Sequence, residues 1–329
     1  MRILKNEDYR LLEQLVGLTQ AGMHRTMAAY LKHKYDNVIV EDKYIVAIGD
    51  IPIALVAHMD TVFKYPVSNM YYDTQKGVIW SPDGLGADDR AGIFVIIQIL
   101  KSGLRPSIIL TTDEESGAVG AKALSEKECP IPNLKYMIQL DRRGTNDCVF
   151  YDCYNPNFID YVEDFGFTEN WGTFSDISVL MPAWKICGVN LSVGYEDEHS
   201  TSEILRVKPL FDTIAKVRKM LMVKDIPTFE FKELKARWYE SFYNINTGGG
   251  YDLGACRCSG CKTMLTEYEL YPAKGSGGIV KNYCPDCIVD KVHWCITCGE
   301  AYDINSSPSN KFCADCLAKE ESISNAKSK

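Results

Sequence analysis

The stretch NVIVEDKYIVAIGDIPIALVAHMDTV, residues 37–62, decides the fold. Its apolar and β-branched runs predict three short strands, at 37–41, 44–48 and 52–57, with a GDIP turn between the last two. The third strand is almost wholly apolar, which is typical of a strand in the middle of a sheet that helices cover on both faces. His58 and Asp60 follow this strand directly, so two polar side chains stand at its carboxyl end.

Helical and strand patterns alternate through the rest of the first 222 residues. Apolar residues at helical spacing predict a helix over 7–34, before the strands. The later segments predict helices at 91–103, 117–128 and 207–222, and strands at 107–113, 136–141 and 185–194. This alternation is the signature of an α/β fold, and we expect a three-layer sandwich with a central mixed, mostly parallel sheet.

The chain is long enough for one large domain and a small appendage. Its 329 residues are 46% hydrophobic and 24% charged, which is the composition of a globular protein with a sizeable core. The periodicity fades after residue 222, and GGGYDLG at 248–254 is typical of a hinge. We therefore predict a large domain at 1–245, a cysteine-rich module at 246–318 and a flexible tail at 319–329.

The net charge of −8 argues against a large basic surface for nucleic acid or an anionic membrane. For the large domain, small or peptidic substrates fit this charge better. The N-terminus has no apolar segment of a signal peptide, and no stretch approaches the roughly 20 apolar residues of a membrane span. We expect a cytoplasmic protein without a membrane partner.

Acidic and histidine residues gather where the predicted strands end, which is where open α/β sheets place their ligands. They are His58 and Asp60 after the third strand, Asp88 and Asp89 after a glycine-rich turn, Glu114 and Glu115, Asp141, and His199. So many carboxylates in one crevice would repel each other unless cations neutralise them. Mixed imidazole and carboxylate ligands suit zinc, and a shared carboxylate can hold two ions about 3.5–4 Å apart. The pattern therefore predicts two metal ions.

Taken singly, each motif has an ordinary structural explanation. GADDRAG at 86–92 is typical of a plain helix start with Asp88 as N-cap, and adjacent glutamates usually form a solvated face. His199 has three acidic neighbours and, alone, would be read as a surface histidine. Their joint occurrence, each at a predicted strand end, favours the metal site.

HMDTV (58–62), GADDRAG (86–92), DEESGAVGA (113–121), the strand-end Asp141 and EHS (198–200) together resemble the co-catalytic dizinc exopeptidases and deacylases. That clan includes peptidase T, carboxypeptidase G, acetylornithine deacetylase and bacterial leucyl aminopeptidases. The similarity runs in order from about residue 30 to residue 222. It implies the zinc exopeptidase fold.

The resemblance also implies roles. His58 and Asp141 would be terminal ligands of the two ions, Asp88 the bridging carboxylate, and Glu115 and His199 the remaining ligands. The ions would be zinc, or cobalt or manganese. Glu114 would be the general base that takes a proton from a metal-bridging water, and Asp60 would orient His58. The peptide bond after the bridging aspartate would be cis.

Two departures from the relatives concern the size of the domain. Only 57 residues separate Asp141 from His199, too few for the dimerisation lid of the carboxypeptidase G and peptidase T branches. The 29 residues between His58 and Asp88 leave no room for the β-barrel insert of tetrahedral aminopeptidases. The catalytic domain is therefore expected to be lidless.

Without a lid, the group that stabilises the oxyanion has to come from elsewhere. Tyr195, Arg142 and Arg143 are the candidates. Residues 171–178, WGTFSDIS, resemble a pocket-lining segment of relatives, and Asp176 there would meet a substrate amine; a turn with an Asp or Ser cap is the competing explanation.

Nine of the 13 cysteines lie between Cys256 and Cys316, and eight of them form four CxxC pairs. The pairs are Cys258 and Cys261, Cys284 and Cys287, Cys295 and Cys298, and Cys313 and Cys316. Eight thiolates are enough for two tetrahedral structural zinc ions, as in zinc-ribbon-like modules. Sequential and cross-braced pairing both fit the spacing. Cys256 and His293 are spare candidates. Such closed sites serve in protein binding or oligomerisation rather than in chemistry.

The sequence thus predicts a zinc-dependent exopeptidase, aminopeptidase-like or dipeptidase-like, that acts on small peptides. An N-acyl amino acid deacylase is the alternative within the same chemistry. An alternative of another class is a non-catalytic scaffold that uses the zinc module to bind protein or nucleic acid, although the presence of Glu114 argues against it.

Overall fold

The computed structural model describes residues 4–172, 174–233, 255–261, 264–266, 270–275 and 280–319. The chain divides into two compact units, Met1–Arg237 and Trp238–Lys329. The predicted boundary at 245 and the tail from residue 320 onwards lie outside the described residues.

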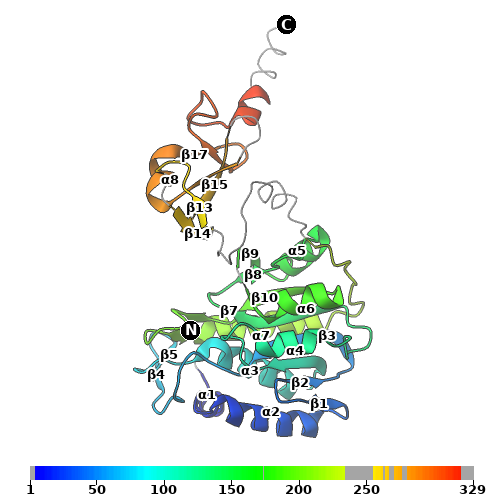
Figure 1. The fold of residues 1–329 in the computed structure, drawn as a ribbon. Coiled ribbons are helices and arrows are strands. Elements are labelled where there is room, and N and C mark those ends of the chain that lie inside the picture. Colours follow the sequence, from blue (N-terminus) through cyan, green and yellow to red (C-terminus); the bar gives the residue numbers. More distant parts are fainter. Residues whose placement is uncertain are drawn as a thin grey trace, which may run out of the picture. The chain divides into compact units, whose positions relative to one another are not determined.

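The larger unit is built on an eight-stranded mixed sheet, in the order β1-β2-β6-β3-β7-β10-β8-β9 (Figure 1). The four central strands β6, β3, β7 and β10 are parallel to one another. Strand β1 pairs antiparallel with β2, β2 with β6 and β8 with β10, whereas β8 and β9 are parallel. The strands are β1 (Val38–Val40), β2 (Tyr44–Ala47), β3 (Ile51–His58), β6 (Pro106–Thr111), β7 (Tyr136–Arg142), β8 (Asp147–Val149), β9 (Thr168–Glu169) and β10 (Cys187–Ser192). The predicted mixed α/β arrangement is confirmed.

Buried β-branched and aliphatic side chains explain why β3 lies in the centre of the sheet. Every residue from Ile53 to His58 in this strand is buried. Both neighbouring strands, β6 and β7, run parallel to it, so their carboxyl ends meet at the edge where His58 ends β3. The sheet therefore brings three strand ends to one place.

The helices of this unit pack on the sheet in two groups. Helix α3 packs against α1, α7, β3 and β7, and helices α4 and α6 pack against each other, with α6 also against β7 and β10. The helices are α1 (Asn6–Val16), α2 (Gln20–Lys34), α3 (Ala87–Lys101), α4 (Val119–Ser125), α5 (Pro156–Glu163), α6 (Asp176–Trp184) and α7 (Val207–Leu221).

The predicted single helix over 7–34 is wrong, because the structure has two helices there. Helix α1 ends at Val16 and α2 begins at Gln20. Thr19 caps the second helix, since its hydroxyl accepts a hydrogen bond from the backbone N–H of Gly22 at 3.1 Å. The threonine therefore starts a new helix within an unbroken apolar pattern.

A second, antiparallel sheet of the larger unit was not predicted from the sequence. Its strand order is β11-β12-β5-β4, with β4 at Tyr71–Asp73, β5 at Val78–Trp80, β11 at Tyr195–Glu196 and β12 at Ile204–Arg206. The segment 197–203, which carries His199, connects β11 to β12. This sheet therefore fixes both ends of the segment.

The described part of the smaller unit contains two small sheets and two helical segments, one of them at 314–319. A two-stranded sheet pairs β13 (Ala255–Arg257) with β14 (Met264–Thr266). A four-stranded sheet has the order β16-β15-β18-β17, from β15 (Tyr271–Lys274), β16 (Val280–Tyr283), β17 (Val292–Trp294) and β18 (Ala301–Asp303). Helix α8 spans Pro285–Lys291. The apolar clusters of this unit include cysteines, as expected for a module too small for a large core.

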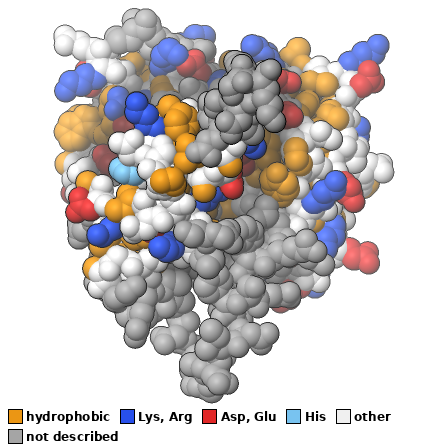
Figure 2. Space-filling view, turned by 90° about the horizontal axis from the view of Figure 1, so that it is seen from above, with side chains coloured by type: hydrophobic (Ala, Val, Ile, Leu, Met, Phe, Trp, Pro, Cys, Tyr) orange, Lys and Arg blue, Asp and Glu red, His pale blue; other side chains and the backbone are white. Residues whose placement is uncertain are grey.

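Charged side chains of both signs are interspersed with hydrophobic ones on the molecular face in Figure 2, among the residues that are coloured there. None of the described helices is long and apolar enough to cross a membrane.

Candidate metal centre

Two side chains from strand ends and one from the start of a helix form the first ligand group: His58, Asp141 and Asp88. His58 ends β3, Asp141 is the sixth residue of β7, and Asp88 lies at the start of α3. His58 Nε2 lies 2.9 Å from Asp88 Oδ1 and 3.4 Å from Asp141 Oδ1. One ligand atom from each residue falls within 4.8 Å of the others, so a single cation fits between them.

Asp88, Glu115 and His199 form a second group with the same compactness. His199 Nε2 lies 3.2 Å from Asp88 Oδ2 and 2.9 Å from Glu115 Oε1. Asp88 thus presents Oδ1 to the first group and Oδ2 to the second. The structure brings all five predicted ligands together, with the predicted bridging residue between the two groups.

The electrostatics of this cluster agree with a place for cations. Burial and the neighbouring Asp88 carboxylate raise the pKa of Asp141 to about 6, and the same two causes raise the pKa of Glu115 to about 7. Hydrogen bonding to Asp88 raises the pKa of His199 to about 9. Carboxylates crowded in a buried site repel each other, and divalent cations neutralise such a set. Two imidazoles and three carboxylates are also the donors that zinc prefers.

Glu114, the predicted general base, lines a cavity of about 180 Å³ together with the proposed ligands Asp88, Glu115, Asp141 and His199. Burial, and then the negative charge of Asp141, raise the pKa of Glu114 to about 9. Glu114 therefore faces the same space as both ligand groups without belonging to either.

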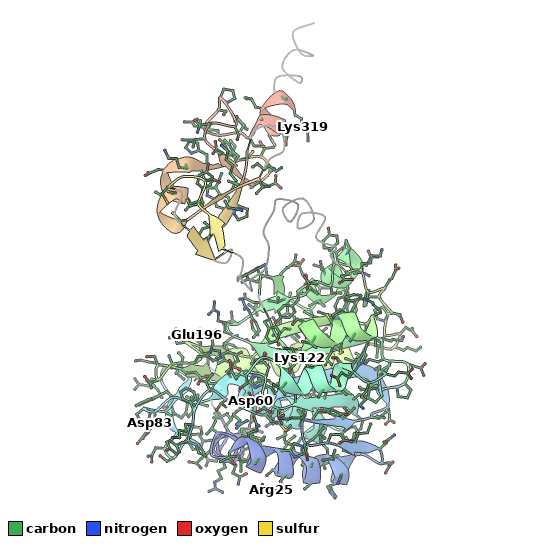
Figure 3. All side chains as sticks on the ribbon, in the orientation of Figure 1. Arg25, Asp60, Asp83, Lys122, Glu196 and Lys319 are labelled. Carbon is green, nitrogen blue, oxygen red and sulfur yellow. The ribbon has the colours of Figure 1, made fainter. Side chains whose placement is uncertain are left out.

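Asp60 connects His58 to the segment that carries the two glutamates. Its Oδ1 lies 3.3 Å from His58 Nδ1, an ion-pair distance without the geometry of a hydrogen bond. The same carboxylate accepts hydrogen bonds from the backbone N–H groups of Glu114 and Glu115, at 3.1 and 3.0 Å. Asp60 lies inside the larger unit, whereas Arg25 and Asp83 lie at its edges (Figure 3).

The turn before α3 adopts an uncommon backbone. The peptide bond between Asp88 and Asp89 is cis, as the resemblance led us to expect, and both residues have non-helical torsion angles. The regular helix therefore begins after them, close to the predicted start at residue 91.

Glu203 is a residue of the site that the sequence analysis missed. Its side chain is fully buried, and its two oxygens accept hydrogen bonds from the backbone N–H groups of Gly86 and Asp88, at 2.5 and 3.0 Å. Burial raises the pKa of Glu203 to about 7. The sequence does not reveal the role of this glutamate, which stands in the polar segment YEDEHSTSE. The backbone groups to which it is hydrogen-bonded lie 115 to 117 positions away in the chain.

Asn190 is the second missed residue. Its Oδ1 accepts a hydrogen bond from the Asp141 N–H at 3.0 Å, and its Nδ2 donates to the Asp141 carbonyl oxygen at 2.8 Å. The amide therefore fixes the backbone of a proposed ligand on the neighbouring strand. A polar residue in the buried strand CGVNLS is the signal that could have revealed it.

The predicted substrate residues occupy different positions. Tyr195 and Arg142 line the cavity, as does Arg143. The Tyr195 hydroxyl donates to Asp141 Oδ1 at 3.1 Å. Asp176, by contrast, is fully buried and does not line the cavity; its Oδ2 accepts a hydrogen bond from Thr111 Oγ1 at 2.5 Å. The position of Asp176 therefore does not suit contact with a substrate amine, and it fits the competing explanation, because Ser175 is the N-cap of α6 and Asp176 is its first residue.

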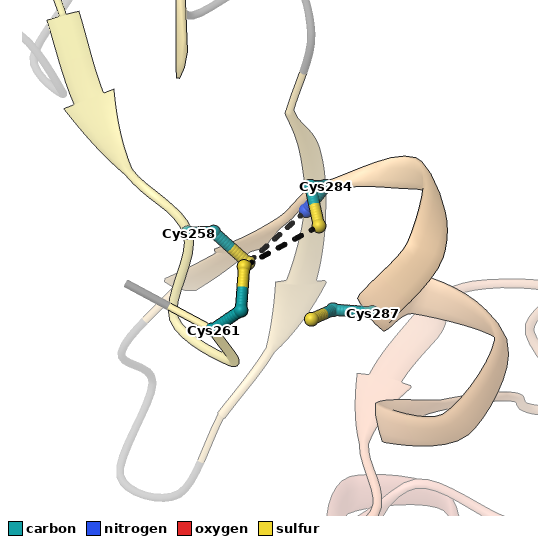
Figure 4. Close-up of side chains that lie close together, drawn as sticks. All are labelled: Cys258, Cys261, Cys284 and Cys287. Atoms are coloured by element: carbon teal, nitrogen blue, oxygen red, sulfur yellow. Dashed lines mark hydrogen bonds between the residues drawn. The ribbon is translucent and has the colours of Figure 1, made fainter. Parts of the chain in front are cut away.

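The cysteine pairs of the smaller unit form two separate clusters. The first consists of Cys258, Cys261, Cys284 and Cys287, whose side chains converge in Figure 4, and the second of Cys295, Cys298, Cys313 and Cys316. The observed pairing is therefore sequential and not cross-braced. His293 belongs to neither cluster, and the side chain of Cys256 lies outside the described part of the chain.

Each cluster holds one thiol that is poised to ionise. Burial alone would raise the pKa of Cys258, but the backbone N–H groups of Cys284, Cys261 and Gly260 lower it to about 6. In the same way, N–H groups around Cys295 lower its pKa to about 6. Thiolates are the form that binds zinc, so both clusters fit structural zinc sites.

The fold and these groups together define a mixed α/β protein with a candidate dinuclear metal centre. No family model matches the chain, and no curated protein matches its sequence. Solved structures do share its fold. A tripeptidase from Staphylococcus aureus subsp. aureus Mu50 aligns with a TM-score of 0.52 at 16% identity, over 67% of this chain and 98% of that chain.

Two archaeal proteins align similarly. A TET aminopeptidase from a marine sediment Thaumarchaeota archaeon has a TM-score of 0.53 at 13% identity, over 68% of this chain and 98% of that chain. The TET1 peptidase of Pyrococcus horikoshii, described as assembling into a tetrahedron or a large octahedral shell, has a TM-score of 0.50 at 13% identity, over 66% of this chain and 99% of that chain. At these identities the likeness shows a common fold.

Proposed function

We propose that the chain is a dinuclear zinc metallohydrolase that cleaves a peptide bond at the end of a short peptide. The observation that carries this proposal is the position of Asp88 between two compact ligand groups, with Glu114 facing the same cavity. The fold shared with a tripeptidase and a TET aminopeptidase supports it.

His58, Asp88 and Asp141 would hold one ion, and Asp88, Glu115 and His199 the other. Zinc suits this donor set best, and cobalt or manganese are the alternatives. Bound there, the ions would activate a water for attack and polarise the substrate carbonyl.

The remaining steps belong to side chains of the chain itself. Glu114 would take a proton from the attacking water and pass it to the leaving amine, since it lines the cavity beside both ligand groups. Asp60 would fix the position of the His58 ring relative to the backbone of Glu114 and Glu115, because its carboxylate contacts both. Tyr195, Arg142 and Arg143 are the candidate donors for a developing oxyanion, since all three line the cavity.

The predicted layers of the large domain belong to the same proposal. The chain moves from β3 to β6 in one direction along the sheet and from β6 to β7 in the other. Because such parallel crossovers are right-handed, α3 and α4 fall on opposite faces, which gives a helix layer on each side.

The smaller unit is proposed to hold two structural zinc ions, one in each cysteine cluster, and to bind a protein partner or mediate oligomerisation. Closed tetrahedral sites of this kind stabilise a fold and leave no position for a substrate.

The replacement Glu114→Gln tests the hydrolase. The variant should keep its metal content, because Glu114 belongs to neither ligand group, and should lose about 10²- to 10⁴-fold in kcat. Aminoacyl-4-nitroanilides, dipeptides and N-acyl amino acids are the substrates to assay with zinc, cobalt and manganese. Hydrolysis of the N-acyl series alone would identify a deacylase instead. Wild-type protein that hydrolyses nothing, yet binds a protein or nucleic acid through residues 256–316, would favour the scaffold.

A further inference from the structure

A second cavity, of about 500 Å³, adjoins the one at the candidate metal centre. The two cavities share part of their walls, because Tyr151, Gly172 and Phe174 line both. The second cavity therefore lies next to the one that the proposed ligands line. Its volume lies within the range of about 300–1,000 Å³ that is usual for ligand pockets.

Polar and apolar groups line the second cavity in about equal parts. Val149, Phe150 and Cys153 line it and are buried. Aromatic side chains around them are unusually open to solvent: Tyr154 is 52% exposed, Trp171 65% and Phe174 44%. Large exposed aromatic side chains gathered around a cavity are typical of a binding site.

Charge decides which side chain fits. Among the described residues that line the cavity, the ionised ones are Asp152 and Glu169, and no lysine or arginine is present. Both carboxylates are exposed, where solvent and salt weaken their attraction for a cation. The same screening weakens their repulsion of an acidic side chain, so their effect is small for either sign and disfavours an acidic side chain only relative to a basic one. The buried lining is apolar, so the best occupant is an aromatic or large aliphatic group.

The structure also fixes this cavity relative to the proposed metal ligands. Tyr151, in the shared wall, accepts a hydrogen bond through its hydroxyl from Asn190 Nδ2 at 2.9 Å, and Asn190 also holds both backbone groups of Asp141. Arg142, the next residue, donates from Nη2 to the Trp171 carbonyl oxygen at 3.1 Å. Two walls of the cavity are thus attached to the end of β7 that carries Asp141.

We propose that this cavity is the specificity pocket of the enzyme and that it receives an aromatic or large aliphatic side chain next to the bond that is cleaved. The inference rests on the proposed hydrolase function, since it assigns the side chain of that enzyme's substrate.

Two dipeptide series, X-Ala and Ala-X with X as Phe, Leu, Ala, Lys or Glu, test the pocket with the zinc-loaded full chain. In one of the series kcat/KM for Phe and Leu should exceed that for Ala by at least about 10-fold, with Glu the poorest substrate. Trp171→Ala and Phe174→Ala should bring the Phe-to-Ala ratio towards one. Trp80→Ala is the matched control, because Trp80 is also an exposed aromatic residue but lines neither cavity.

A binding experiment separates this inference from the hydrolase itself. Zinc-loaded Glu114→Gln is titrated with Phe-Ala, Ala-Phe and Ala-Ala by calorimetry, with and without Trp171→Ala. Tighter binding of a phenylalanyl peptide, lost with Trp171→Ala, supports the pocket even if the wild type hydrolyses nothing. Hydrolysis without preference, a preference for Lys or Glu, or a Phe-to-Ala ratio that survives both aromatic replacements overturns the pocket and leaves the hydrolase intact. If the protein shows neither hydrolysis nor selective binding, both the pocket and the hydrolase function are overturned.

Discussion

Asp88 is the side chain that the two ligand groups share, with Oδ1 towards His58 and Oδ2 towards His199. Asp88→Asn keeps the shape of the side chain and removes its charge, so one proposed ion loses its oxygen ligand and the other keeps only a neutral amide oxygen. We expect zinc affinity to fall by more than the roughly 10- to 100-fold that follows loss of an orienting partner. Competition with a chromophoric chelator measures this. Asp83→Asn, at an exposed carboxylate, is the control; equal affinity in both variants would contradict the bridging role.

Glu203 acts on the same aspartate through the backbone, because it holds the N–H groups of Gly86 and Asp88. Glu203→Gln replaces one of the two carboxylate oxygens by an amide NH2 group. This group is a donor, and it would face a backbone N–H that also donates. We expect about a 10- to 100-fold loss in metal affinity without loss of the fold. Chelator competition and circular dichroism check the two parts. Glu126→Gln changes an exposed glutamate and should alter neither.

The ligands were open to prediction because each stands in a short motif at a strand end. His58 and Asp141 end buried strands, and the apolar residues before them already place them at the edge of the sheet. Glu203 had no comparable signal, and Asn190 had only its place as a polar residue in a buried strand, since the partners of both are backbone groups far away in the sequence. Asp176 misled for the opposite reason, because its motif resembles a pocket segment while its side chain points to Thr111 in the interior.

The hairpin of β11 and β12 positions His199, and an ion pair joins its strands. Arg206 donates from Nε and Nη2 to the two carboxylate oxygens of Glu196, at 2.6 and 2.8 Å. Hydrogen bonds from Arg206 lower the pKa of Glu196 in the folded protein, more than burial raises it. The pair therefore stabilises the fold above the unfolded pKa of about 4.3, and this contribution is lost as the pH falls through the lower, folded value.

Glu196→Gln tests this contribution. In chelator-treated protein at pH 7 the variant should be less stable than the wild type by less than about 1 kcal/mol, since the pair is partly exposed and screened. The difference should shrink below pH 4 and at high salt. Urea unfolding at several pH values measures it. A difference that is constant with pH would mean that the charge of Glu196 does not matter.

The central strands were predictable because they are long and apolar, whereas the hairpin strands were not. Strands β11 and β12 have only two and three residues, and β12 pairs with β5 about 125 positions earlier in the chain. No local pattern encodes such a pairing, which depends on where α3 and the main sheet bring the two segments. The break between α1 and α2 was encoded locally, by Thr19, but the apolar pattern continues across it.

The ligand groups of the larger unit share no residue with those of the smaller unit. Loss of metal from one unit should therefore leave the ligands of the other unit in place. Four groups predict four zinc ions per chain when the centre is fully loaded. A mild chelator should remove two ions and all activity first, because closed thiolate sites hold zinc with apparent binding free energies of about 10–16 kcal/mol.

Cys284→Ser should lower the zinc content by one ion and destabilise the smaller unit while kcat/KM stays unchanged. Cys129→Ser changes a thiol outside both clusters and should retain all four ions. Atomic emission of the dialysed proteins counts the zinc. If Cys284→Ser loses its activity together with one of the four ions, the cysteine module contributes to catalysis, contrary to a purely structural role.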